Sequence, residues 1–236
     1  NTQIVDTKWA NEEEQELAED IHSLLSFSGS SKIEEDNKMS GLCEHQLPLL
    51  IHARQTCVLP ALLTKHVERM IENDELDDTP ELRKALGSTS KIDQVVKTIL
   101  ERKDNQRGKL VFCHFRGEID RIKSLLKQQD LCVETFDGRV AHSERARILT
   151  EKCDVLILQI KTGCEGLNLQ KYSEVYFTSP HWNPAIENQA MARCHRIGQE
   201  KPTKVFRFAM KGFDDSEESL SLDQYCNDIQ EFKRGL

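Results

Sequence analysis

DVLILQI, residues 154–160, is an almost unbroken run of apolar and β-branched side chains. A strand with one face in water alternates apolar and polar residues, whereas a continuous apolar run is typical of a strand buried on both faces. Strands of that kind occur mostly in parallel sheets that helices cover on both sides. Residues 154–160 therefore predict a central strand of a parallel α/β sheet.

Short β-branched runs alternate with helical patterns on both sides of this segment. This alternation indicates βαβ units, in which each helix connects two parallel strands. We expect further strands over 109–113, 131–136, 174–178 and 203–208, and helices over 92–100, 118–126, 145–149 and from Pro184 onward.

The flanking segments have helical patterns only. Residues 11–25 place Leu17, Ile21, Leu24 and Leu25 on one stripe, and their acidic residues fall in the first turns, where the helix dipole favours them. Residues 47–70 predict two helices with breaks at Pro48 and Pro60, and 217–233 predict a C-terminal helix. We therefore expect an acidic helical segment over 1–87, an α/β domain over 88–210 and a C-terminal helix over 211–236.

The composition restricts the class of protein. No apolar run approaches the ~20 residues of a membrane-spanning helix, and no secretory signal opens the sequence. The eight cysteines include no C-x-x-C pair, which indicates free thiols in a reducing, intracellular compartment and no metal site. Because the chain begins with Asn1 rather than Met, we expect it to be a piece of a longer polypeptide.

Charge is distributed unevenly along the chain. The net charge is −8, yet residues 91–210 carry 21 Lys and Arg against 15 Asp and Glu, whereas residues 1–90 carry 8 against 18. A basic middle segment is compatible with phosphate binding, although a solvated surface can carry the same excess.

The loops expected at the carboxyl ends of the strands are rich in polar and glycine residues. They read HFRG from 114, DGRVAHSER from 137, KTGCEGLNLQ from 161 and SPHWNPAIENQAMARCHRIGQ from 179. In open parallel sheets these ends meet at one edge, where ligands bind. The sequence therefore predicts a binding site there.

Three polar residues of the helix from Pro184 fall on one stripe. Gln189, Arg193 and Arg196 are separated by four and three residues, beside a predicted core stripe of Ile186, Ala190, Cys194 and Ile197. Guanidinium groups bind phosphate oxygens in pairs, so the arginines suit a dense anion, although two solvated arginines would share this spacing. Gly163 and Gly166 follow the buried strand where backbone turns sharply or approaches a ligand.

The usual phosphate loop of an ATPase is absent from the sequence. A Walker A motif requires G-x-x-x-x-G-K-[ST], and the Gly108-Lys109 pair has Lys103 in place of the first glycine. No apolar strand ends in Asp-Glu, so the residues that hold Mg-ATP are missing.

Four stretches in order carry a family resemblance. They are KLVFCHFRGEIDRIKSLL from 109, FDGRVAHSERARIL from 136, LILQIKTGCEGLNLQKYSEVYF from 156 and SPHWNPAIENQAMARCHRIGQEKPTKVFRF from 179. They closely resemble helicase motifs four, five and six in the second RecA-like lobe of the Snf-type DNA translocases, superfamily-two ATPases that include chromatin remodellers. HARQTCVLPALL at 52–63 also resembles the family's helical segment before this lobe.

The resemblance implies a RecA-like fold and an ATP site shared between two lobes. The first lobe, absent from this chain, would hold the phosphates and Mg²⁺, so the chain alone is expected to be inactive. Arg193 and Arg196 fall on the motif-six arginines, with Arg196 as the expected arginine finger and both as catalytic residues. The implied nucleotide-binding set is Gln189, Gly163, Gly166, Arg193 and Arg196.

The resemblance also implies double-stranded DNA as the track. The residues that fall on DNA-contacting positions of the family are Lys161, Thr162, Asn168, Trp182 and His114. A side chain of Trp182 packed under Pro184 is the structural alternative. The expected partners are this DNA and a first RecA-like lobe, in the same longer chain or in trans, and no membrane.

Several positions depart from the family pattern. Glu165 replaces a glycine of motif five, His181 and Ala192 replace aspartates, and Arg139 replaces a hydroxyl residue after Asp137-Gly138. These changes leave two functions open: a motor lobe of a DNA-dependent ATPase, or a non-catalytic lobe that binds DNA or a protein. The location would be the nucleus in a cell, or the host cytoplasm or virion for a large DNA virus.

Overall fold

The computed structural model describes residues 1–25, 47–161, 167–195, 197–214 and 219–235. The chain divides into two compact units, one formed by residues 1–5 and 92–208 and the other by residues 6–91 and 209–236. No helix among the described residues is long and apolar enough to cross a membrane.

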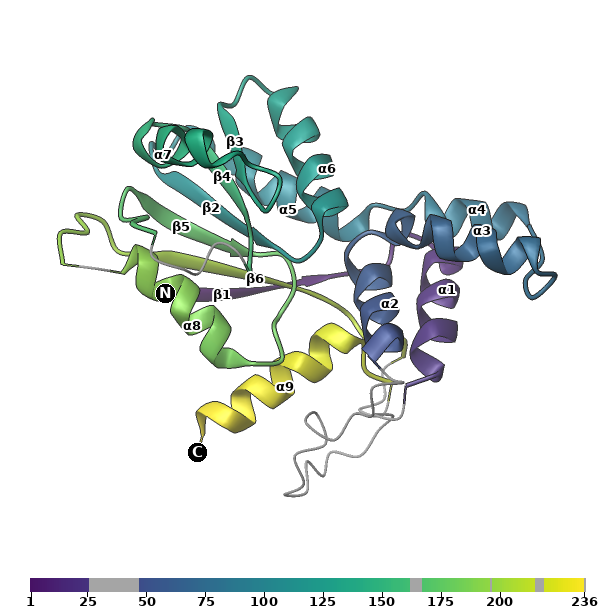
Figure 1. The fold of residues 1–236 in the computed structure, drawn as a ribbon. Helices are drawn as coiled ribbons and strands as arrows, with labels where there is room; N and C mark the ends of the chain where they lie inside the picture. The colour runs from purple at the N-terminus through teal and green to yellow at the C-terminus, as the bar shows by residue number, and fades with distance from the viewer. Residues whose placement is uncertain (26–46, 162–166, 196, 215–218, 236) are drawn as a thin grey trace. The chain divides into compact units, whose positions relative to one another are not determined.

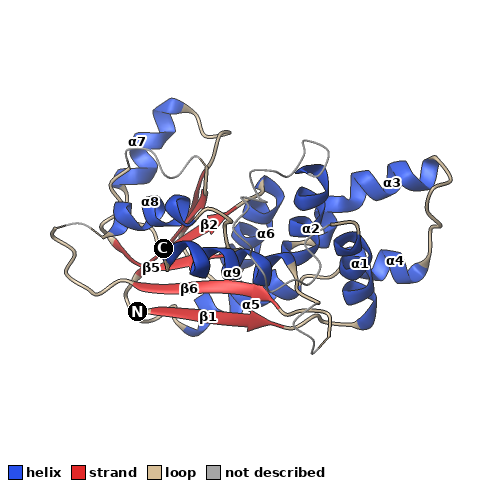
Figure 2. Ribbon diagram, turned by 90° about the horizontal axis from the view of Figure 1, so that it is seen from below, coloured by secondary structure: helices blue, strands red, loops and turns tan. Residues whose placement is uncertain are grey.

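A six-stranded sheet forms the core of the first unit (Figure 1). Its strands are β1 (Thr2–Thr7), β2 (Gly108–Cys113), β3 (Val133–Phe136), β4 (Val155–Gln159), β5 (Tyr172–Phe177) and β6 (Lys204–Met210). Their order across the sheet is β1-β6-β5-β2-β4-β3, and Figure 2 shows β1, β6, β5 and β2 in sequence. The pairs β2–β4, β2–β5, β3–β4 and β5–β6 are all parallel. The predicted parallel α/β fold is confirmed.

The expected strand at 154–160 is β4, and it is an interior strand. Residues Val155 to Leu158 are fully buried. Ile157 pairs with Val111 on one side and with Thr135 on the other. β4 therefore lies one place from the sheet edge rather than at its middle, which β2 and β5 occupy.

Helices cover both faces of the sheet. They are α5 (Ser90–Glu101), α6 (Arg116–Lys127), α7 (His142–Thr150) and α8 (Pro184–Cys194). Leu110, Phe112 and Leu158 form one core cluster with Ile148 of α7 and Ala190 of α8. Side chains alternate along a strand, so the intervening residues face α5 and α6 on the other side of the sheet (Figure 1).

The second unit is helical. It contains α1 (Glu12–Ser23), α2 (Leu47–Val58), the short 3₁₀ helix η1 (Pro60–Leu63), α3 (Thr64–Glu72), α4 (Pro80–Leu86) and α9 (Leu222–Arg234). Pro60 opens η1 and ends the preceding helix as expected. Pro48 is instead the second residue of α2, where its missing N–H costs no helical hydrogen bond.

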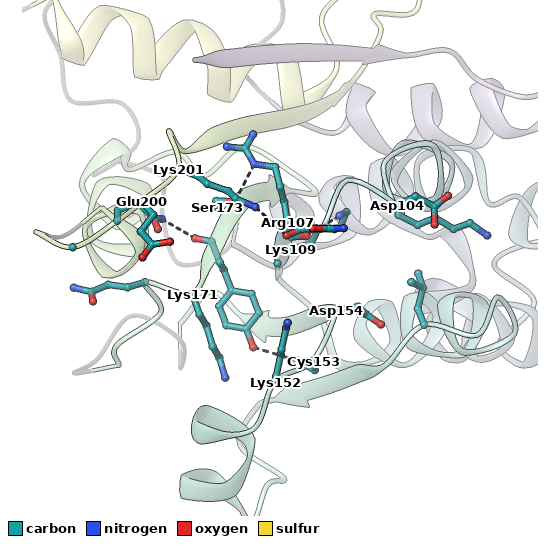
Figure 3. A pocket seen from close by; sticks show the side chains of 18 residues that line it. Asp104, Arg107, Lys109, Lys152, Cys153, Asp154, Lys171, Ser173, Glu200 and Lys201 are labelled. Carbon is teal, nitrogen blue, oxygen red and sulfur yellow. Dashed lines mark hydrogen bonds between the residues drawn. The ribbon is translucent and has the colours of Figure 1, made fainter.

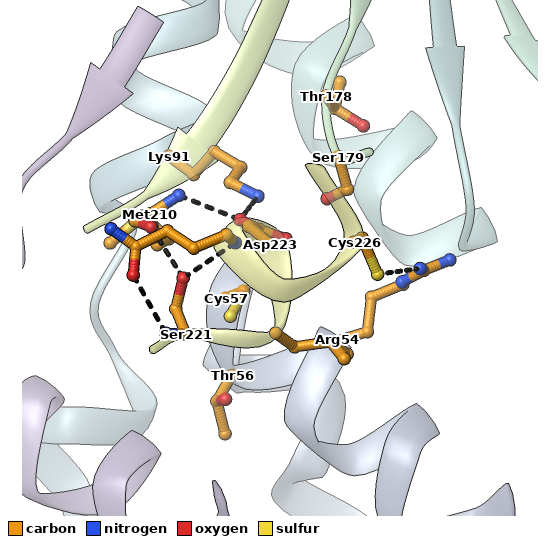
Figure 4. Close-up of polar contacts among 12 residues, drawn as sticks. Arg54, Thr56, Cys57, Lys91, Thr178, Ser179, Met210, Ser221, Asp223 and Cys226 are labelled. Carbon is orange, nitrogen blue, oxygen red and sulfur yellow. Dashed lines mark hydrogen bonds and ion pairs between the residues drawn. The ribbon is translucent and has the colours of Figure 1, made fainter. Parts of the chain in front are cut away.

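A buried polar network lies between helices of this second unit (Figure 4). Lys91 forms an ion pair with Asp223, the second residue of α9, and Asp223 also accepts a hydrogen bond from the backbone N–H of Met210 at 2.9 Å. Ser221 caps α9 and donates its hydroxyl hydrogen to the Met210 carbonyl at 2.7 Å. These contacts fix the start of α9 to the end of β6.

Two elements were not predicted. β1 is an edge strand of residues 2–7, and α4 occupies residues 80–86, directly after the acidic turn. The side chain of Thr79 caps α4 by accepting from the N–H of Leu82 at 3.1 Å, and Pro80 follows at the first helical position. Threonine followed by proline is a recognised signal for the start of a helix, so the sequence could have predicted α4.

Candidate functional site at the carboxyl edge of the sheet

The loops that follow β2, β4 and β5 meet at the carboxyl edge of the sheet. His114, directly after β2, contacts the carbonyl of Ser179 through Nε2 at 3.2 Å, and its ring stacks on that of His181 with centroids 6.0 Å apart. Gln159 at the end of β4 donates to the His114 carbonyl at 3.2 Å. The loops after β2 and β5 are therefore in direct contact, and the end of β4 contacts the loop after β2.

Glu118 fixes the loop after β2. Its carboxylate is fully buried and accepts from the backbone N–H groups of His114 and Phe115 at 3.0 and 3.2 Å. The hydroxyl of Thr178, at the end of β5, donates to the other carboxylate oxygen. One side chain thus caps α6 and joins two loops, so the loop that carries His114 has a defined position.

The loop after β5 is built around the start of α8. Asn183 caps this helix by accepting from the N–H of Ala185 at 3.0 Å, and Pro184 stands at the first helical position. His181 accepts from the N–H of Asn183 at 2.9 Å and contacts the ring of Trp182, with centroids 4.9 Å apart. Trp182 is half-buried beside His181 at this edge.

A buried ion pair holds α8 on the sheet. Glu187 of α8 has no exposed side-chain surface, and its Oε2 lies 2.8 Å from Nη1 of Arg207 on β6. The Arg207 guanidinium lies over the ring of Phe177, 5.6 Å from the ring centroid. Together with fully buried Ala190 and Cys194, this pair fixes the orientation of α8.

The polar stripe of α8 is only partly described. Gln189 is exposed and Arg193 is half-buried, and the Arg193 carbonyl accepts from the N–H of Leu169 at 3.1 Å. Arg196 lies outside the described residues. The helix ends at Cys194, because His195 has a non-helical ψ of 75°. The prediction that Ile197 continues the core stripe is therefore wrong, and its side chain is fully exposed.

The loop after β4 is described only at its two ends. Lys161 and Asn168 are exposed, and the side chain of Asn168 accepts from the N–H of Gln170 at 3.3 Å. Thr162, Gly163 and Gly166 lie outside the described residues, as does Glu165. The structure thus places Lys161, Trp182 and His114 on loops at the carboxyl edge, whereas Asn168 lies at the other end of its loop, close to the start of β5 at the amino-terminal edge.

Arg139 has a role that the sequence did not indicate. Its guanidinium donates to both carboxylate oxygens of Asp120 on α6, at 2.8 and 2.9 Å, and to Asp137 at 2.7 Å. The hydrogen bonds from Arg139 to Asp137 lower the pKa of the Asp137 carboxyl despite its burial. Arg139 therefore fixes the loop between β3 and α7 against α6. An arginine two residues after the strand-ending aspartate is the signal that could have suggested it.

Neither the cysteines nor the acidic residues of the described regions provide other chemistry at this edge. Burial raises the pKa of Cys113 and Cys194, so both thiols stay protonated. No group of three or more His, Cys, Asp or Glu side chains suited to a metal ion occurs among the described residues. The site as described combines the exposed side chains of Lys161 and Gln189 with the half-buried side chains of His114, Trp182 and Arg193.

Comparisons with known proteins agree with this architecture. Residues 90–198 match the helicase conserved C-terminal domain. Over 161 residues, 63% of this chain, it is 37% identical to the DNA repair protein RAD5 of Candida albicans and 33% identical to that of Eremothecium gossypii. It is also 32% identical over 171 residues to an uncharacterised ATP-dependent helicase of Mycoplasma pneumoniae. The matches span only 14% to 15% of those relatives.

A solved structure shares the fold over nearly the whole chain. The C-terminal part of the Fun30 ATPase domain superimposes with a TM-score of 0.62 at 19% identity, covering 98% of this chain and 96% of that one. The RecA-like fold is thereby established. The match over 90–198 shows that the chain contains a helicase conserved C-terminal domain, and the RAD5 relatives together with the Fun30 fold support a second, C-terminal RecA-like lobe of the Snf type.

Proposed function

We propose that this chain is the second motor lobe of an ATP-dependent translocase on double-stranded DNA. A first lobe, in the same longer polypeptide or in trans, would supply the phosphate loop and the Mg²⁺ ligands that this sequence lacks. The fixed position of α8 carries the proposal. The buried Glu187–Arg207 pair and the packed Ala190 and Cys194 hold the helix that presents Arg193.

The nucleotide would be bound by the α8 stripe and the loop after β4. Gln189 and Arg193 are one helical turn apart, so both side chains project from the same side of α8. Arg196, as the arginine finger, and Gly163 and Gly166 would complete the set. A guanidinium at the γ-phosphate neutralises charge in the transition state, which is worth ~10³-fold or more in related chemistry.

The DNA backbone would be contacted by the loops of the carboxyl edge. The proposal is supported by the exposure of Lys161 and by the contact between the loops that carry His114 and Trp182. Lys161 and Thr162 would bind phosphate oxygens, because an ammonium and a hydroxyl are common phosphate ligands. Such contacts position the lobe on DNA without reading its sequence.

Turnover in a two-lobe protein tests the ATP site. The chain is joined to a first ATPase lobe, and DNA-stimulated ATP hydrolysis is measured for Arg193→Ala and Arg196→Ala. We expect each variant to lose about 10³-fold in kcat while ATP binding is largely retained. Arg121→Ala, an exposed arginine on α6, is the matched control and should retain full turnover. Full turnover by Arg196→Ala would overturn the assignment of the finger.

Salt titration of duplex binding separates the motor from a non-catalytic lobe. A phosphate-binding lobe loses affinity as salt rises, and Lys161→Glu should make this dependence shallower. If the joined protein hydrolyses no ATP while the chain still binds DNA in a salt-dependent way, the chain is a binding module. Affinity that does not change with salt excludes phosphate contact in either case.

A further inference from the structure

A basic basin lies at the opposite, amino-terminal edge of the same sheet (Figure 3). Its volume is about 990 Å³, and residues of the first unit line it throughout. The lining comes from four loops at the starts of strands, over 103–109, 152–154, 170–173 and 198–201, together with Leu131. None of these residues belongs to the ATP and DNA positions proposed above.

Five cations of the basin have no carboxylate partner among the described residues. They are Lys103, Arg107, Lys152, Lys171 and Lys201. The ammonium of Lys171 donates to the carbonyls of Leu149, at 3.0 Å, and of Glu151. Carbonyl oxygens orient an ammonium group without cancelling its charge, so the five cations stay available to an anion.

The acidic residues of the basin do not balance these cations. Three carboxylates line it, those of Asp104, Asp154 and Glu200. Asp154 accepts a hydrogen bond from the N–H of Cys132 at 2.8 Å. A sixth cation, Lys109, is buried and lies 3.5 Å from the fully buried carboxylate of Glu174. The basin therefore carries a net positive charge from its exposed groups.

Buried hydrogen bonds give the basin a fixed shape. The Glu174 carboxylate accepts from Arg102 at 2.8 Å and from Asn105 at 2.8 Å, which anchors the loop between α5 and β2. Although burial disfavours its charge, these donors and the hydroxyl of Tyr176 lower the pKa of Glu174, so it stays ionised. The anchored loop carries Lys103 and Arg107 on its rim.

A second set of contacts joins this loop to the one before β6. Arg107 donates to the hydroxyl of Ser173 at 3.1 Å and to the carbonyl of Pro202 at 2.6 Å. Lys201 donates to the carbonyl of Gln106 at 3.2 Å. The cations are thus held on a frame that exists before any ligand binds, which reduces the entropic cost of binding.

The lining chemistry indicates which anion the basin fits. Lysines bind phosphates as point charges and do not read bases. The one aromatic residue among the described lining residues is Tyr172, whose side chain is 1% exposed and contacts Cys153 through its hydroxyl at 3.2 Å. Single-stranded nucleic acid is usually held by exposed aromatic rings that stack on bases, and the basin offers none.

We infer that the amino-terminal edge is a second binding surface for the phosphodiester backbone of duplex DNA. This surface is independent of the carboxyl-edge contact in the proposed function and goes beyond it. It would let the lobe touch a second stretch of duplex, or a second duplex, on its opposite side. Binding here needs neither ATP nor a particular base sequence.

Fluorescence anisotropy with a labelled 20-base-pair duplex tests the inference on the 236-residue chain. Lys103 and Lys152 are exposed and make no hydrogen bond or ion pair to the described residues, so Lys103→Glu/Lys152→Glu should leave the fold intact. Lys97→Glu/Arg121→Glu, on α5 and α6, changes the net charge equally and is the control. Circular dichroism melts verify folding, and Lys103→Gln/Lys152→Gln serves as a milder variant.

Lys103→Glu/Lys152→Glu, the basin pair, is expected to weaken duplex binding about tenfold at 0.1 M salt. It should also lower the slope of log affinity against log salt by about 1 to 2. The control pair should leave that slope unchanged. The proposal would be overturned by equal losses of affinity in the basin pair and the control pair. It would also be overturned if the chain bound a 20-nucleotide single strand more tightly than duplex, or if poly-glutamate displaced the DNA at lower concentration than unlabelled duplex.

Lys161→Glu separates this inference from the proposed function. If Lys161→Glu lowers the salt slope and the basin pair does not, the carboxyl-edge contact stands and the basin is excluded. If only the basin pair lowers it, the basin stands and the carboxyl-edge contact is excluded. A wild-type chain that binds no duplex at low salt overturns both.

Discussion

Lys91 and Asp223, 132 positions apart in the chain, form an ion pair whose side chains are 0% and 1% exposed. Oδ2 of Asp223 accepts a hydrogen bond from the Lys91 ammonium and another from the N–H of Met210. Removing one partner of a buried pair leaves the other charge without compensation in a low-dielectric interior. This geometry makes the stability of the helical unit sensitive to the loss of either partner.

Lys91→Met should therefore lower the free energy of unfolding by about 3 to 5 kcal/mol, measured by urea denaturation at pH 7. The double variant Lys91→Met/Asp223→Asn should recover most of this loss. The double variant leaves no charged side chain at either position, and the asparagine side-chain oxygen can still accept the hydrogen bond from the N–H of Met210. A loss below about 1 kcal/mol in the single variant would contradict a buried, compensating role for Lys91.

The stability of the helical unit should fall in mild acid because of His22. Its Nδ1 contacts the carbonyl of Ala18 at 2.6 Å and its Nε2 accepts from the N–H of Leu222 at 3.0 Å, so the neutral Nδ1–H tautomer fits the site. Burial lowers the pKa of His22 from 6.5 to about 4.

The unfolded chain therefore binds this proton first as the pH falls. The contribution of His22 is complete above pH 6.5 and is lost between pH 6.5 and 4, at a cost of about 3 kcal/mol by pH 4. His22→Gln should be less stable at pH 7 but should lack this pH-dependent component. Urea midpoints at pH 7, 6, 5 and 4 measure the difference, and parallel pH profiles for the two proteins would exclude the assignment.

Glu118 should be more important for stability than a typical helix-cap residue, because its carboxylate is fully buried. Glu118→Ala leaves the N–H groups of His114 and Phe115 without this acceptor, while the Thr178 hydroxyl keeps the Phe112 carbonyl at 3.1 Å, so we expect a loss of about 2 to 4 kcal/mol in unfolding free energy. Exposed Ser124→Ala on the same helix is the control, with an expected change below about 0.5 kcal/mol. Thermal denaturation of the two variants compares them, and similar midpoints would argue against the shared-acceptor role.

Gly108 is required where β2 begins. A Cβ at this position would lie 2.9 Å from the Lys171 carbonyl oxygen and 2.9 Å from Cδ1 of Tyr172, which is closer than real contacts allow. Gly108→Ala should therefore destabilise the sheet by about 1 to 3 kcal/mol. Gly87→Ala is the matched control, because its nearest neighbours would be 3.5 and 3.6 Å away. A denaturant midpoint for Gly108→Ala equal to that of Gly87→Ala would refute the steric requirement.

The elements that the sequence predicts well are those whose local residue pattern determines their structure. β4 is apolar from Val155 to Leu158, and α8 has Asn183-Pro184 at its start, so neither needs information from elsewhere in the chain. β1 gave no such signal, because residues 2–6 are exposed or half-buried and the strand exists only through its pairing with β6.

The candidate site was predictable in its location but not in its supports. Parallel topology places the carboxyl-end loops together, so His114, Trp182 and Lys161 were expected at one edge. The partners of Glu118 and Glu187 are Thr178 and Arg207, 60 and 20 residues away, and no local pattern indicates such pairs. The basic basin was also not expected, because the rule that located the site concerns only the opposite edge.

The pairing of β1 with β6 determines when the sheet can be completed. The carbonyl of Asn1 accepts from the N–H of Val205, so the first residues described must wait for a strand made about two hundred positions later. During synthesis at about 5 to 20 residues per second, this segment stays without its partner for roughly ten seconds or more. This edge of the sheet therefore forms late, and a nascent chain carries residues 1–7 without a strand partner until β6 has been made.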